Sequence, residues 1–286
     1  MGRLAVVLGV ALLLGAWGVR WAGELSGLVA GTPVAAPAGP TADLNPFVYV
    51  PAGAARAQPV RVLVALHGMG GDGATFSRDL LAVADANSWI VVAPTFAYRD
   101  YRDPALVRAD DAAFLPRLAA ILDGLPARTG LALRPRVLLY GFSRGAQTAH
   151  RFATVYPARV LGVAALSAAD YTLPTAVAPG DGHPLQFPFG VADQFAVFGH
   201  PFDPAAFRRV AFLIAVGGRD TNAADVPRAW DPYLGRTRVE RAAAYARALR
   251  DAGVRVSLRV DPASAHEVSA RTRAAALTFL RSLEVA

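Results

Sequence analysis

The stretch Gly141-Phe142-Ser143-Arg144-Gly145 constrains the fold of this chain more than any other, because of the segments on either side. Residues 136–140 before it form an apolar, partly β-branched run, which indicates a buried strand. Residues 146–153 after it have helical composition, and Pro157 follows. A strand, Gly-x-Ser-x-Gly and a helix are typical of a sharp turn that presents a nucleophilic serine. The strained turn leaves no room for side chains two residues before or after Ser143, which explains the two glycines.

Apolar runs that resemble strands alternate with helical stretches along the rest of the chain. Strands are expected at 47–51, 60–66, 89–93, 137–140, 160–167, 210–216 and 254–260. Helices are expected at 79–87, 110–125, 236–252 and 270–283, with Pro116 predicting a kink or a later start in the second. Continuous apolar strands separated by helices predict an α/β fold, with a mostly parallel central sheet covered on both faces.

The chain divides into three predicted parts. Residues 4–19 are uncharged and apolar behind a basic start, which predicts a signal peptide or an N-terminal membrane anchor over 1–22. A buried N-terminal helix is the alternative. Residues 23–44 are expected to be a flexible Pro/Ala/Gly linker, and 45–286 the catalytic domain. The predicted location is therefore outside the cytoplasm: secreted, periplasmic, or tethered to a membrane through residues 4–19.

Residues 169–208 interrupt the alternation with a long stretch rich in proline and phenylalanine. Because long loops in compact domains are usually functional, we expect a cap or pocket-lining insertion here. The alternative is an irregular segment whose aromatic side chains pack over the sheet edge. Phe187 and Phe189 are candidate substrate contacts, as are Gly70 and Trp230, although Trp230 could instead pack the following helix onto the sheet.

A serine nucleophile needs a base, and that base needs a carboxylate to orient it. His266 follows the last predicted strand, at the sheet edge where α/β proteins bind ligands. His150 lies seven residues after Ser143 on the same helix, ~10 Å along its axis, and is interpreted as structural. Asp220 follows the strand at 210–216 and a glycine turn, and is the preferred acid; Asp225 is the alternative.

Acyl transfer also requires donors for a developing oxyanion. The backbone N–H of Arg144 is one candidate. The other is that of Met69, within the glycine-rich loop 67–73, where backbone groups can approach a ligand closely. His67 is expected to hold this loop in shape. The loop lacks the lysine and spacing of a phosphate-binding motif.

Composition argues against several other functions. The formal charge is +7, but all 29 basic residues are arginines and are scattered, so nucleic-acid binding is not expected. Cysteine is absent, which excludes disulfides and thiolate metal sites. We expect neither a metal nor a cofactor.

These motifs resemble those of the α/β-hydrolase superfamily over about residues 45–283. Within it, the chain looks like secreted esterases related to polyhydroxybutyrate depolymerases and feruloyl or acetyl-xylan esterases. The resemblance rests on Leu66-His67-Gly68-Met69-Gly70-Gly71, Gly141–Gly145, Gly217-Gly218-Arg219-Asp220 and Ala265-His266. It implies Ser143 as nucleophile, Asp220 as acid and His266 as base, with the Met69 and Arg144 amides as the oxyanion hole. The implied substrate is a small-molecule or polymer ester. The cation of Arg144 beside the nucleophile departs from the family pattern, as does the absence of cysteines and of a polymer-binding module.

Three functions remain open at this stage. A serine esterase is the first, a peptidase or amidase with the same triad the second, and a non-catalytic binding protein on a hydrolase scaffold the third. The phenylalanines of 169–208 favour an apolar or aromatic acyl group, whereas Arg144 and Arg219 favour a negatively charged one.

Overall fold

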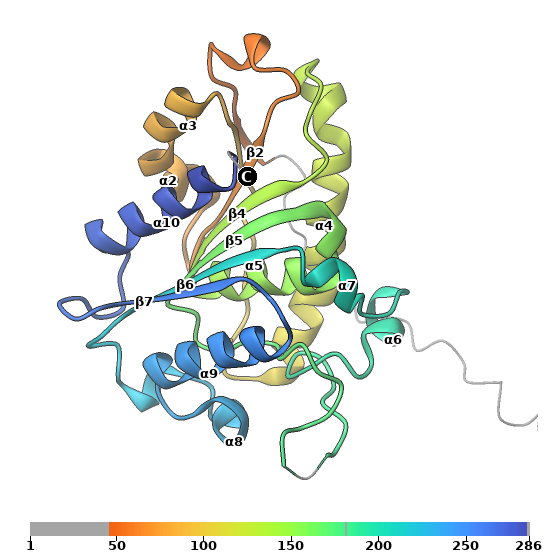
Figure 1. Cartoon of the computed structure of the whole chain (residues 1–286), viewed down its shortest axis with the longest axis vertical. Coiled ribbons are helices and arrows are strands. Elements are labelled where there is room, and N and C mark those ends of the chain that lie inside the picture. Colours follow the sequence, from red (N-terminus) through yellow and green to blue (C-terminus); the bar gives the residue numbers. More distant parts are fainter. Residues whose placement is uncertain (1–45, 181, 285–286) are drawn as a thin grey trace, which may run out of the picture. The chain divides into compact units, whose positions relative to one another are not determined.

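The computed structural model describes residues 46–180 and 182–284, and a seven-stranded sheet runs through their centre (Figure 1). The predicted segments 1–22 and 23–44 lie outside the described residues. The strands are β1 (Phe47–Tyr49), β2 (Val62–Leu66), β3 (Ile90–Ala93), β4 (Val137–Phe142), β5 (Val160–Leu166), β6 (Ala211–Gly217) and β7 (Val256–Asp261). Their order is β1-β3-β2-β4-β5-β6-β7, and β1 alone pairs antiparallel. The predicted, mostly parallel sheet is confirmed.

Helices cover both faces of this sheet. They are α2 (Gly73–Ser77), α3 (Leu81–Asn87), α4 (Pro104–Thr129), α5 (Arg144–Val155), α6 (Gln194–Phe198), α7 (Pro204–Phe207), α8 (Asp231–Leu234), α9 (Arg238–Asp251) and α10 (Ala270–Ser282). Helices α4, α5 and α9 lie on one face, and α2, α3 and α10 on the other (Figure 1). Every residue of β2, β3 and β6 is buried, because apolar side chains pack on both sides. This two-sided burial explains the continuous apolar runs of the sequence.

Helix α4 is longer than the predicted helix at 110–125, and Pro116 neither starts nor ends it. The start is set by Asp103, whose carboxylate accepts a hydrogen bond from the N–H of Ala105, with Pro104 in the first turn. Proline fits that position because its missing N–H would have no partner there. Gly130, with φ of 68°, ends the helix.

Residues 169–208 form a long excursion between β5 and β6 that contains only the short helices α6 and α7 within its described part. Its aromatic side chains largely turn inward. Phe187 is 2% exposed and contacts Phe198 edge-on, while Phe207 packs between Phe202 and Phe212. Across 46–180 and 182–284, no helix is long and apolar enough to cross a membrane.

Candidate active site

Ser143, His266 and Asp220 form one continuous chain of hydrogen bonds at the carboxyl ends of β4, β7 and β6. The Oγ of Ser143 lies 3.0 Å from Nε2 of His266. On the other side of the ring, Nδ1 of His266 lies 2.8 Å from Oδ2 of Asp220. The structure thus brings together the three side chains singled out in the sequence, in the relative positions of a nucleophile, a base and an orienting carboxylate.

The backbone at Ser143 has the strain expected of such a turn, with φ of 53° and ψ of −119°. The flanking glycines are required by close approach. A Cβ on Gly145 would lie 2.0 Å from the carbonyl oxygen of Leu66, and one on Gly141 would lie 2.4 Å from that of Gly145. The steric interpretation of Gly141 and Gly145 is therefore confirmed.

The two candidate acids have different surroundings. Besides His266, Asp220 accepts a hydrogen bond at Oδ1 from Nη1 of Arg238, at 2.8 Å. Burial alone would raise the pKa of Asp220, but the hydrogen bond from His266 and the charge of Arg238 outweigh it, so this pKa lies below its usual range. Asp225 instead accepts at Oδ2 from the side-chain amide of Asn222, at 2.9 Å. Asp220 is thus the carboxylate that contacts His266.

The glycine-rich loop after β2 lies against Ser143. A Cβ on Gly68 would come within 3.3 Å of the Cβ of Ser143. His67 holds this loop as predicted: Nε2 accepts from the N–H of Phe96 at 3.0 Å, and Nδ1 lies 2.7 Å from the carbonyl of Gly68. Because Nε2 accepts and the carbonyl of Gly68 can only accept, Nδ1 carries the proton, and burial lowers the pKa of His67. The N–H groups of Met69 and Arg144 are not among the hydrogen-bond donors of the described residues.

A cavity of about 310 Å³ opens beside Ser143. Its walls include Met69, which is 42% exposed, and three polar residues that the sequence analysis did not identify: Tyr101, Gln147 and Arg238. Gln147 is 1% exposed and one helical turn after Ser143, and its Oε1 has no hydrogen-bond partner among the described residues. Its spacing of four residues from the serine was the only signal in the sequence that could have identified it.

The predicted substrate contacts Gly70, Phe187, Phe189 and Trp230 do not line this cavity. Gly70 is exposed and has φ of 67°, a backbone conformation that favours glycine. Trp230 is fully buried and packs on Phe189, with ring centroids 4.4 Å apart. Burial of large apolar rings stabilises the core, and Phe187 and Trp230 are both buried.

Segment 169–208 is likewise not a lid over Ser143. Among its described residues, Ala169 alone borders the cavity beside Ser143. Residues 183–189 of this segment instead line a second cavity of about 460 Å³, with Arg108 and Tyr233 on its other walls.

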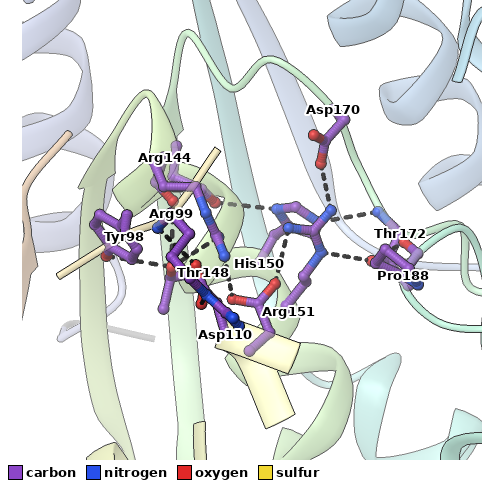
Figure 2. Close-up of polar contacts among 12 residues, drawn as sticks. Tyr98, Arg99, Asp110, Arg144, Thr148, His150, Arg151, Asp170, Thr172 and Pro188 are labelled. Carbon is purple, nitrogen blue, oxygen red and sulfur yellow. Dashed lines mark hydrogen bonds and ion pairs between the residues drawn. The ribbon is translucent and has the colours of Figure 1, made fainter. Parts of the chain in front are cut away.

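Arg144 does not place a free cation beside Ser143. Its guanidinium is buried, donates from Nη2 to Oδ1 of Asp111 at 2.8 Å, and lies over the ring of Tyr98. Asp111 also accepts from Nη1 of Arg151 at 3.0 Å, and Arg151 pairs in turn with Asp170. Figure 2 shows this buried network extending from Arg144 through Arg151.

The two cations behind the expectation of a negatively charged acyl group therefore give it no support. The charge of Arg144 is neutralised within the network of buried arginines and aspartates. Arg219 is exposed and is not among the residues that line the cavity.

His150 belongs to the same buried region and has the structural role predicted for it. Its Nε2 accepts from the N–H of Thr172 at 3.0 Å, and Nδ1 lies 3.0 Å from the carbonyl of Ala146 (Figure 2). Burial, reinforced by the charge of Arg151, holds the pKa of His150 well below its ordinary value of 6.5. Within the described residues, no group of three or more His, Asp or Glu side chains is arranged to hold a metal ion.

Comparison with known proteins identifies the fold. No protein-family model and no curated protein matches the chain. Among solved structures, it is similar to poly(aspartic acid) hydrolase-1 from Sphingomonas sp. KT-1, with 19% identity, a TM-score of 0.56, and 86% of this chain and 98% of that chain covered. It is also similar to a phospholipase/carboxylesterase from Dyadobacter fermentans, with 16% identity, a TM-score of 0.55, and 84% and 98% covered. A carboxylesterase from Bacillus cereus matches at 15% identity and a TM-score of 0.54, with 84% and 94% covered. With the strand order described above, these similarities establish the α/β-hydrolase fold.

Proposed function

We propose that this chain is a serine hydrolase that cleaves carboxylic esters through an acyl-enzyme intermediate. The observation that carries the proposal is the hydrogen-bond chain from Ser143 through His266 to Asp220. Ser143, at one end of this chain, borders a cavity that a substrate can enter. The α/β-hydrolase fold and its carboxylesterase members among the similar structures support the same reaction class. The finer relation to polyhydroxybutyrate depolymerases and feruloyl esterases remains a prediction from the motifs.

The geometry provides a complete path for the proton. His266 accepts the Ser143 proton at Nε2 as Oγ attacks the ester carbonyl, while Asp220 holds Nδ1–H and stabilises the imidazolium. The N–H groups of Met69 and Arg144 stabilise the oxyanion. Collapse of the tetrahedral intermediate expels the alcohol, which takes the proton from His266. A water molecule then gives a proton to His266 and attacks the acyl-enzyme carbonyl. This step releases the carboxylic acid, and Ser143 takes the proton back from His266.

A series of p-nitrophenyl esters tests this proposal. We expect the wild-type protein to hydrolyse at least part of a chain-length series, and Ser143→Ala to lose that turnover. Including a feruloyl ester and a polyester in the panel would distinguish small-molecule from polymer substrates. A folded wild-type protein without turnover on any of these esters would contradict the proposal.

The same triad could instead cleave amide bonds, as a peptidase or amidase. Matched p-nitrophenyl ester and p-nitroanilide substrates with one acyl group separate the two activities. We expect the enzyme to cleave the ester faster than the anilide. The ratio of the two rates should exceed the ratio for the same substrates without enzyme. A non-catalytic binding protein would bind a ligand tightly and release no product.

A location outside the cytoplasm remains a proposal that rests on residues 4–19 alone.

A further inference from the structure

Asp220 has two oxygens, and a different side chain contacts each of them. Oδ2 accepts from His266 at 2.8 Å, and Oδ1 accepts from Nη1 of Arg238, also at 2.8 Å. The second nitrogen of the same guanidinium, Nη2, donates to the backbone carbonyl of Asp225 at 2.7 Å. Arg238 therefore spans the loop from Asp220 to Asp225 and fixes the carboxylate from the side opposite His266.

The stability of helix α9 does not explain why an arginine stands at position 238. It is the first residue of α9, where the helix dipole repels a cation, and its side chain is 4% exposed. The Nε–H of Arg238 is buried without a hydrogen-bond partner among the described residues. Helix α9 already has a capping box between Thr237 and Glu240, so Arg238 is not needed to start it. The ion pair with Asp220 compensates the cost of burying the Arg238 guanidinium.

We propose that Arg238 is a positioning residue for the reaction, holding Asp220 oriented toward His266 throughout the catalytic cycle. The inference rests on the proposed function above. Arg238 also borders the cavity beside Ser143, but its proposed effect on the reaction passes through Asp220. The groups that interact electrostatically with Asp220 are Arg238, His266 and the buried Tyr171.

Replacing Arg238 with methionine tests this role, because methionine keeps an apolar stem and removes the guanidinium. We expect kcat to fall by at least about tenfold, and by less than the ~10⁴-fold that follows loss of a triad carboxylate's acceptor. KM should change little. The acidic limb of the kcat/KM profile should move to higher pH, since the carboxyl of Asp220 loses a cation that favours its ionised form. Arg236→Met is the matched control, because Arg236 is an exposed arginine just before the same helix.

Added guanidinium provides a readout that a purely structural role would not give. In Arg238→Ala, a low, non-denaturing concentration of guanidinium chloride should restore part of kcat, whereas sodium chloride should not. Arg236→Ala should respond to neither salt. If Arg238→Met does not fold, Arg238→Lys replaces it with the same readouts, and an intermediate kcat is expected.

The outcomes separate the inference from the function on which it rests. An active wild type whose Arg238 variants keep kcat and the pH profile, even with a lower Tm, shows that Arg238 only pins the loop and overturns the inference. A wild type that neither hydrolyses esters nor reacts with a fluorophosphonate overturns the proposed function, and the inference with it. Loss of kcat, an acidic limb at higher pH and rescue by guanidinium support both.

Discussion

The guanidinium of Arg144 lies 2.8 Å from the carboxylate of Asp111, and neither side chain is more than 1% exposed. Arg144 directly follows Ser143 and begins α5, whereas Asp111 belongs to α4. The ion pair therefore fixes the start of the helix that follows Ser143 to the neighbouring helix from inside the protein. Asp111 also pairs with a second arginine, Arg151, which pairs in addition with Asp170, so Asp111 joins both cations.

Removing the charge of Asp111 should strongly destabilise the fold. We expect Asp111→Asn to lower the free energy of unfolding by about 3–5 kcal/mol, because it leaves the buried guanidinium of Arg144 without its carboxylate partner. Asp123→Asn is the control in the same helix, since Asp123 pairs with Arg159 at the surface and is 65% exposed. That change should cost less than about 1 kcal/mol. Urea denaturation of both variants is the measurement, and equal effects would contradict the interpretation.

His150 should make stability depend on pH. The unfolded chain takes up a proton at His150 near pH 6.5, whereas the folded chain takes it up only at much lower pH. The free energy of unfolding should therefore be highest above pH 6.5 and fall below it, by up to about 1.4 kcal/mol per pH unit from this group. Urea denaturation between pH 7 and pH 5 should give a shallower decrease for His150→Gln. Parallel curves for the two proteins would disprove this role.

The close approach at Gly145 predicts that even one methyl group disrupts the nucleophile's turn. Gly145→Ala should lower activity and destabilise the protein by at least about 1–3 kcal/mol, because its Cβ would meet backbone atoms that cannot move aside. Gly124→Ala is the matched control within α4, since Gly124 is exposed and a Cβ there meets nothing within 4 Å. The control should be slightly stabilising. Activity and Tm measured on both variants decide the point.

The assignment of the acid can be tested with two isosteric changes. Asp220→Asn should reduce kcat by up to ~10⁴-fold, because the amide cannot hold His266 in the required tautomer. Asp225→Asn should have little effect, since the part of Asp225 that contacts Arg238 and Tyr101 is its backbone carbonyl. A larger loss in Asp225→Asn would reverse the assignment.

The fold and the core of the site were predictable because their signals are local. A buried strand, two close-packed glycines and a helix follow one another around Ser143, and Asp220 and His266 each follow a strand of the same parallel sheet. Parallel strands bring their carboxyl ends to one edge, so sequence order alone indicated that these residues meet.

The rest of the site depends on contacts between distant segments. Tyr101, Gln147 and Arg238 come from the segment before α4, from α5 and from α9, and no short motif links them. The direction of the Arg144 side chain depends on Asp111, 33 positions away. The surroundings of the phenylalanines of 169–208 could not be predicted, because apolar composition indicates burial but not whether the buried surface is a pocket or the core.

The most direct test of the central claim is covalent labelling of the nucleophile. The wild-type protein would be incubated with a fluorophosphonate and analysed by intact mass and peptide mapping, with Ser143→Ala as the control. We expect a single adduct on Ser143 in the wild type, abolished labelling in the variant, and parallel loss of ester hydrolysis. Wild-type protein that remains unlabelled, or an adduct at another residue with hydrolysis intact in Ser143→Ala, would contradict it.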